Sequence, residues 1–171
     1  PLSPSTKGVA LESLSLVLAG APGWLNEEIY QAPTKFGVED KVKFVGQVFH
    51  EDLPALMSGS QAFVFPSLFE GFGLAPLEAM ACGVPVIMSN ITSLPEVGGE
   101  GALYVDPSSP GDIASKMELV LSTSDTDRKL VAEKGLVQAR KFSWEQAAKE
   151  TISVLEEAIT RHREVSRPVA I

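Results

Sequence analysis

A regular alternation of short apolar runs with longer segments of helical periodicity constrains the fold most. The apolar runs predict strands at residues 14–20, 42–46, 62–66, 84–89 and 102–105. The spacing of apolar residues between and after them predicts helices at residues 24–36, 52–58, 74–81, 112–121, 125–142 and 145–163. Strands separated by helices imply βαβ crossovers. The expected fold is therefore α/β, a Rossmann-like, doubly wound parallel sheet followed by C-terminal helices.

The length and the apolar content predict a single folded domain. The chain has 171 residues, of which 44% are hydrophobic, and one domain commonly takes about 100 to 200 residues. Such a chain can bury a core, which argues against a disordered protein. We therefore expect one domain over residues 1–171, with its helical C-terminal part at residues 111–171.

The charge is unevenly distributed. The formal net charge is −8, and all of it arises in residues 1–110, where four basic residues face twelve acidic ones. This balance argues against a nucleic-acid partner, because binding to phosphate backbones requires clustered Lys and Arg. Any proposal that this region binds phosphate must account for the negative charge.

Other residue types exclude several classes of protein. The single Cys82 cannot form an internal disulfide, and two His residues without clustered carboxylates predict no metal site. The longest apolar runs are far shorter than the roughly 20 residues of a membrane span, and no segment resembles a signal peptide. We therefore expect no transmembrane segment and a cytoplasmic domain.

The loop after the predicted strand 62–66 combines two glycines with the start of a helix. It reads Glu70-Gly71-Phe72-Gly73, and the predicted helix begins at Leu74. In doubly wound sheets ligands bind outside the carboxyl ends of the strands. The glycines leave backbone amides uncovered, and the positive end of the helix dipole adds to them. The loop is therefore predicted to bind an anion such as a phosphate or diphosphate.

Two carboxylates, Glu70 and Glu78, flank this predicted anion site. Carboxylates accept hydrogen bonds and repel phosphate, so they suit the hydroxyl groups of a sugar or ribose. Two Glu residues at this spacing are also common by chance, with Glu70 as a charge near a helix N-terminus and Glu78 as a surface acid. These residues alone leave both interpretations open.

The run from Phe65 to Ile87 resembles the E-x7-E signature of retaining glycosyltransferases of the GT-B fold, family 4, also called group 1. Further stretches resemble the same family in the same order, at residues 16–24, 42–48, 52–56, 89–97, 103–107 and 142–145. The resemblance implies the C-terminal half of a GT-B fold. This half binds a nucleoside-diphosphate sugar in a metal-independent hexosyltransferase that transfers to a hydroxyl acceptor and needs no cofactor besides its donor.

The resemblance also implies roles for individual residues. Glu70 matches the catalytic-site glutamate that hydrogen-bonds the hydroxyls of the transferred sugar, and Glu78 matches the glutamate that binds the ribose. The backbone that meets the sugar and diphosphate corresponds to Gly71, Phe72, Gly73 and Leu74. The turn along the nucleobase corresponds to Gly46, Gln47 and Val48. Lys7 matches a lysine that neutralises the diphosphate, and residues 1–13 match a remnant of the first strand and helix region.

This chain departs from the family pattern at its N-terminal side. The family places an Arg shortly before that Lys, and this position is either occupied by Pro1 or lies before it. The N-terminal GT-B domain, which completes the cleft, is expected as a partner, and transfer by this chain alone is expected to be absent. A non-catalytic domain that binds nucleotide sugars is the alternative. A dehydrogenase is disfavoured, because no predicted strand is followed by Gly-x-Gly-x-x-Gly.

The resemblance leaves three properties open: the nucleobase and sugar of the donor, the oligomeric state, and peripheral membrane association of a full-length enzyme.

Overall fold

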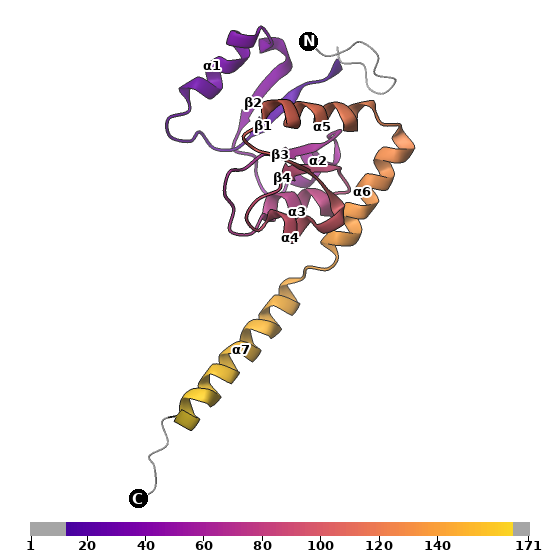
Figure 1. The fold of residues 1–171 in the computed structure, drawn as a ribbon. Coiled ribbons are helices and arrows are strands. Elements are labelled where there is room, and N and C mark those ends of the chain that lie inside the picture. The colour runs from indigo at the N-terminus through magenta and orange to yellow at the C-terminus, as the bar shows by residue number, and fades with distance from the viewer. Residues whose placement is uncertain (1–12, 166–171) are drawn as a thin grey trace, which may run out of the picture.

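The computed structural model describes residues 13–165 and has an α/β architecture (Figure 1). Its five strands are β1 (Leu16–Ala19), β2 (Val42–Gly46), β3 (Phe63–Phe65), β4 (Val86–Ser89) and β5 (Ala102–Val105). Its helices are α1 (Glu27–Phe36), α2 (Leu53–Ser58), α3 (Leu74–Ala81), α4 (Leu94–Gly98), α5 (Pro110–Ser122), α6 (Asp125–Ala139) and α7 (Trp144–Val165). Two short 3₁₀ helices, η2 (Glu39–Lys41) and η3 (Gly99–Gly101), precede β2 and β5. The predicted α/β fold class is confirmed, and only α4 and the 3₁₀ helices were not predicted.

The larger sheet is parallel and has the strand order β3-β4-β5. All four residues of the central strand β4 are buried, because it has a neighbour on each edge and helices on each face. Val86 and Met88 pack in a core with Met80 of α3 and Leu94 of α4. Ile87, which points to the other face, packs with Val120 of α5. Figure 1 shows α5 on one side of this sheet and α3 with α4 on the other.

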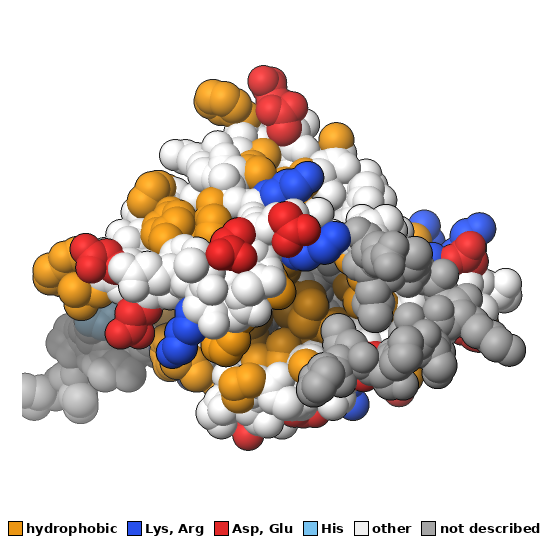
Figure 2. Space-filling model, turned by 90° about the horizontal axis from the view of Figure 1, so that it is seen from above, with side chains coloured by type: hydrophobic (Ala, Val, Ile, Leu, Met, Phe, Trp, Pro, Cys, Tyr) orange, Lys and Arg blue, Asp and Glu red, His pale blue; other side chains and the backbone are white. Residues whose placement is uncertain are grey.

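The smaller sheet consists of β1 and β2, which pair in parallel. Helix α1 covers part of it, since the rings of Tyr30 and Phe44 lie 4.5 Å apart. All four residues of β1 are exposed. Seen from above, over α1 and this sheet, hydrophobic side chains emerge between charged ones (Figure 2).

The predicted sheet is therefore divided in the described part of the chain, because no strand pairing joins β2 to β3. A strand in the middle of a doubly wound sheet is covered on both faces. Helices cover β4 in this way, whereas β1 is open to solvent.

Helix α7 projects away from the rest of the molecule (Figure 1). Its side chains from residue 144 to residue 162 are all exposed. The hydroxyl of Ser143 accepts a hydrogen bond from the amide of Gln146 at 3.0 Å, which caps the start of this helix. The contacts that hold the fold together thus lie before α7.

Candidate functional site

The loop of residues 66–73 leaves the carboxyl end of β3 and lies against the segment that follows β4. Three side chains hold the loop, one from the last residue of β4 and two from the segment after it. The Ser89 hydroxyl donates to the carbonyl of Ser67 at 2.6 Å, and the Thr92 hydroxyl accepts from the amide of Glu70 at 3.3 Å. The Ser93 hydroxyl lies 3.0 Å from the carbonyl oxygen of Glu70 and 2.9 Å from that of Phe72. The loop that carries the predicted anion site is therefore anchored to the next βα connection.

Gly73 determines where this loop becomes helix α3. Its φ of 114° lies in the region that favours glycine, and a Cβ added there would lie 2.7 Å from Cδ2 of the fully buried Leu94. The carbonyl of Gly73 accepts the hydrogen bond of the Leu77 amide at 3.3 Å, which starts the helix. The amides at the first positions of a helix have no intrahelical carbonyl to bond. This loop and helix start are where the sequence predicts an anion site.

Glu70 and Glu78 lie on the two sides of this helix start. Glu70 is half-buried in the loop, and Glu78 is exposed, one turn into α3. The Cys82 thiol follows Glu78 by one helical turn. Its pKa is raised by burial and, second, by the negative charge of Glu78. Glu78 is therefore accessible to a ligand and acts electrostatically on its own helix face.

Gly46, Gln47 and Val48 lie at the carboxyl end of β2, on the smaller sheet. Gly46 has a φ of 68°, and its carbonyl accepts the amide of Gly20 at 2.8 Å, which ties the ends of β1 and β2 together. Within residues 13–165, no hydrogen bond joins residues 46–48 to the loop of residues 66–73. Lys7 lies outside the described residues. The structure thus places Glu70, the glycine loop and Glu78 on one unit, and the predicted base-binding turn on another.

Sequence reasoning missed the residues that hold the loop in place. These are Ser89, Thr92 and Ser93, together with Phe142, whose ring meets the edge of the Phe72 ring at a centroid distance of 5.8 Å. Phe142 lies between α6 and α7, so this segment contacts the loop. The polar residues at the end of a buried strand and just after it, Ser89, Asn90, Thr92 and Ser93, were a signal that could have pointed to the first three.

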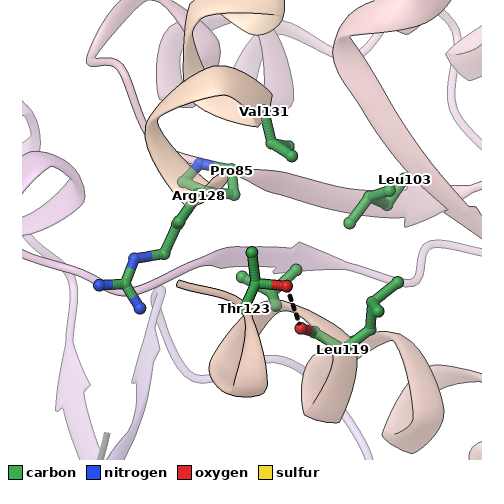
Figure 3. A pocket seen from close by; sticks show the side chains of 7 residues that line it. Pro85, Leu103, Leu119, Thr123, Arg128 and Val131 are labelled. Carbon is green, nitrogen blue, oxygen red and sulfur yellow. Dashed lines mark hydrogen bonds between the residues drawn. The ribbon is translucent and has the colours of Figure 1, made fainter. Parts of the chain in front are cut away.

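A small cavity of about 130 Å³ lies elsewhere, near the amino end of β4 (Figure 3). It is lined by Pro85, Leu103, Leu119, Val120, Thr123, Arg128 and Val131. The Thr123 hydroxyl donates to the carbonyl of Leu119, and Arg128 pairs with Asp125 through Nη2. Nη1 of Arg128 is buried without a hydrogen-bond partner among the described residues. The cavity holds none of the predicted site residues and is a packing gap between β5, α5 and α6.

Across residues 13–165, no three or more His, Cys, Asp or Glu side chains gather where they could hold a metal ion. None of the helices in that part of the chain combines the length and apolar character needed to cross a bilayer.

Comparison with known sequences adds to this geometry. Residues 6–134 match the sequence profile described as "Glycosyl transferases group 1". The chain is 42% identical over 138 residues to the O-antigen chain mannosyltransferase B of Escherichia coli, covering 81% of this chain and 36% of that protein. It is 33% identical over 130 residues to the MMP alpha-(1->4)-mannosyltransferase of Mycolicibacterium hassiacum, covering 74% of this chain and 32% of that protein. The chain thus spans about a third of the length of these two relatives.

Solved structures share the fold. Sucrose-phosphate synthase from Thermosynechococcus elongatus superposes with a TM-score of 0.78 at 28% identity, over 86% of this chain and 39% of that one. The HepE protein of Anabaena, in complex with UDP and glucose, superposes with a TM-score of 0.74 at 23% identity, over 84% of this chain and 40% of that one.

Proposed function

Because this chain belongs to the group 1 glycosyl transferase family, we propose that it forms the donor-binding domain of a retaining, metal-independent hexosyltransferase. In this proposal residues 1–171 bind a nucleoside-diphosphate sugar. The remaining part of a longer enzyme, an N-terminal GT-B domain, presents a hydroxyl acceptor. The part that matches this chain makes up only about a third of each relative, which supports a division of this kind.

One observation carries the proposal. The loop of residues 66–73 ends at the left-handed Gly73 and is anchored by Ser93, so it brings backbone amides to the N-terminus of α3. The diphosphate of the donor binds there, because amide groups and the helix dipole favour negative charge. The same amides stabilise the diphosphate as negative charge builds up on it during transfer.

The two carboxylates provide the polar contacts beside the diphosphate. Glu70, half-buried in the loop, accepts hydrogen bonds from hydroxyls of the transferred sugar. Glu78, exposed on α3, accepts those of the ribose. The nucleobase lies along the turn at the end of β2, formed by Gly46, Gln47 and Val48. Lys7 neutralises part of the diphosphate charge.

The reaction replaces the bond between the anomeric carbon and the diphosphate oxygen by a bond to the acceptor oxygen on the same face of the sugar. The acceptor proton leaves with the diphosphate. Glu70 orients the sugar in this step and forms no covalent bond to it. Orienting both substrates and excluding water requires a cleft with two walls. We therefore expect this chain alone to bind the donor without transferring the sugar.

The choice of donors to test follows from the names of the relatives. Two of the relatives are mannosyltransferases, and one structure of the same fold holds UDP and glucose. Mannose and glucose donors therefore come first, each with UDP, GDP and ADP as the nucleotide. Binding is measured by titrating the chain and following its backbone amide NMR signals. Shifts at residues 71–78 support the site, and their absence with every ligand would overturn it.

Two substitutions separate the roles of the carboxylates. Glu78→Ala is expected to weaken the binding of all nucleoside diphosphates about tenfold, because hydrogen bonds to a charged group are lost. Glu70→Ala is expected to weaken the binding of only the sugar-bearing ligands, by a similar factor. Glu133→Ala, on the exposed face of α6, serves as the control and leaves binding unchanged. If the effects of the two site variants are exchanged, the assignment of roles is wrong.

A further inference from the structure

We propose that Ser93 is a positioning residue of the donor site, whose hydroxyl turns the amides of Gly71 and Gly73 toward the bound diphosphate. This inference rests on the proposed function, and it adds a residue outside the loop and outside the predicted signature. Among the described residues, Ser93 is the only one whose hydroxyl lies within hydrogen-bond distance of two carbonyl groups of the loop.

Ser93 gathers two carbonyl groups at one point. Its oxygen lies 3.0 Å from the carbonyl oxygen of Glu70 and 2.9 Å from that of Phe72. A hydroxyl has one hydrogen to donate, so the two carbonyls share it or receive it alternately. In either case both carbonyls face Ser93.

The direction of these carbonyls fixes the direction of two amides. The described residues contain no cis peptide bond, and in a trans peptide the carbonyl and the following N–H point in opposite directions. The carbonyl of Glu70 shares its peptide group with the amide of Gly71, and the carbonyl of Phe72 with the amide of Gly73. Both amides therefore point away from Ser93, to the opposite side of the loop.

The direction of the first amide of α3, that of Leu74, is also fixed by the carbonyl group in the same peptide. The carbonyl of Gly73 accepts the Leu77 amide inside the helix, so the amide of Leu74 points out of the helix N-terminus. The amides of Gly71 and Gly73 depend on Ser93, whereas the amide of Leu74 depends on the helix itself. Removing the Ser93 hydroxyl should therefore disturb the first two and leave the third in place.

Ser93 is itself held in a fixed position. The next residue, Leu94, is fully buried and lies against Gly73. The residue before it, Thr92, has a φ of 55°, a conformation that β-branched residues rarely adopt, and its hydroxyl accepts the amide of Glu70. The residues on both sides of Ser93 thus contact the same loop that its hydroxyl bonds.

The decisive variant is Ser93→Ala, tested in this chain with inorganic pyrophosphate, UDP, GDP and ADP, and the corresponding nucleosides. The affinity for pyrophosphate, and for whichever of UDP, GDP and ADP the wild-type chain binds, is expected to fall about tenfold. The affinity for the nucleoside with the same base is expected to stay within twofold. The amide NMR signals of Gly71 and Gly73 are expected to move in the free protein, and that of Leu74 to move less. Ser93→Thr, which keeps a hydroxyl, is expected to restore binding.

Two control variants complete the design. Ser115→Ala removes another serine hydroxyl that bonds a carbonyl, that of Gly111 in α5, and leaves binding unchanged. Ser93→Cys, which replaces the hydroxyl by a weak donor of similar size, is measured in the same way should Ser93→Ala fail to fold.

Each outcome decides between the two proposals. If the wild-type chain binds neither pyrophosphate nor any nucleoside diphosphate, the proposed function is wrong and this inference falls with it. If the wild type binds and the variant without a hydroxyl binds equally well, only the inference is wrong. Equal losses for nucleoside and diphosphate would assign Ser93 a merely structural role and also overturn the inference.

Discussion

Gly73 meets two requirements that no other residue type meets together. Its backbone has a φ of 114°, and the space beside its Cα is filled by Leu94. The positive φ favours a residue without a Cβ, and the contact with the buried Leu94 leaves no room for one. The start of α3, and with it the proposed diphosphate site, depends on this one position.

Gly73→Ala is expected to lower the free energy of unfolding by about 2 to 4 kcal/mol, because the strained backbone and the displaced Leu94 both cost energy. Urea unfolding followed by circular dichroism measures it. Gly71→Ala is the matched control in the same loop, since a Cβ there meets nothing within 4 Å. It is expected to change stability by less than about 0.5 kcal/mol. Equal effects of the two substitutions would contradict the role given to Gly73.

The residues of the site differ in how far sequence reasoning could reach them. The glycines, Glu70 and Glu78 lie within nine consecutive positions, so this stretch and its resemblance to a family signature were enough to predict them. Thr92 and Ser93 act on the loop from more than 20 residues away. Only the pairing of β3 with β4 brings the two segments together, so the polar residues after β4 do not by themselves show which loop they contact. The roles proposed for the predicted residues remain predictions.

At the level of elements, the sequence predicted every α-helix of the described residues except α4. Helix α3 spans Leu74–Ala81, as expected, because glycines stand on both sides of it. Helix α4 has five residues, Leu94–Gly98, fewer than two turns, which is too short for a periodic pattern to be visible. The strand positions were predicted, but the separation into two sheets was not, since it depends on which faces become covered.

Helix α6 is attached to α4 by a buried side chain, that of Gln138. Its Nε2 donates to the carbonyl of Val97 at 2.9 Å, and its Oε1 accepts from Nζ of Lys141 at 2.7 Å. An added Cβ at Gly99 would collide with this side chain. Gln138 therefore fills the space between the two helices and satisfies a carbonyl of α4.

Gln138→Ala is expected to destabilise the fold by about 1 to 3 kcal/mol, because it leaves a buried carbonyl without its donor and opens a gap. Thermal unfolding measured by calorimetry tests this. Lys141→Ala removes only the exposed partner of Gln138 and is expected to change stability by less than about 0.5 kcal/mol. If Lys141→Ala destabilises the fold as much as Gln138→Ala does, the contact between Lys141 and Gln138, and not the buried bond from Gln138 to Val97, accounts for the stabilisation.

For the whole molecule, the uneven charge bears directly on the proposed ligand. The net charge of −8 arises in residues 1–110, which hold the loop of residues 66–73, and a diphosphate is also negative. The two repel one another at long range. Salt screens this repulsion, since the Debye length falls from about 30 Å at 0.01 M to about 8 Å at 0.15 M.

Affinity for the bound nucleoside diphosphate is therefore expected to rise about twofold or more when salt increases from 0.01 M to 0.15 M. Isothermal titration calorimetry at the two salt concentrations measures this. The corresponding nucleoside, which carries no charge, is the control and is expected to bind equally at both. Weaker binding of the diphosphate at higher salt would instead indicate that cationic side chains dominate its binding.

The anchored loop of residues 66–73 has a consequence for mutational surveys. A loop that binds through its N–H groups keeps those groups whatever side chains it carries, so alanine scanning leaves them in place. Only proline removes a backbone donor outright. A survey by alanine alone would therefore register side chains such as that of Ser93 and pass over the backbone groups proposed to contact the diphosphate.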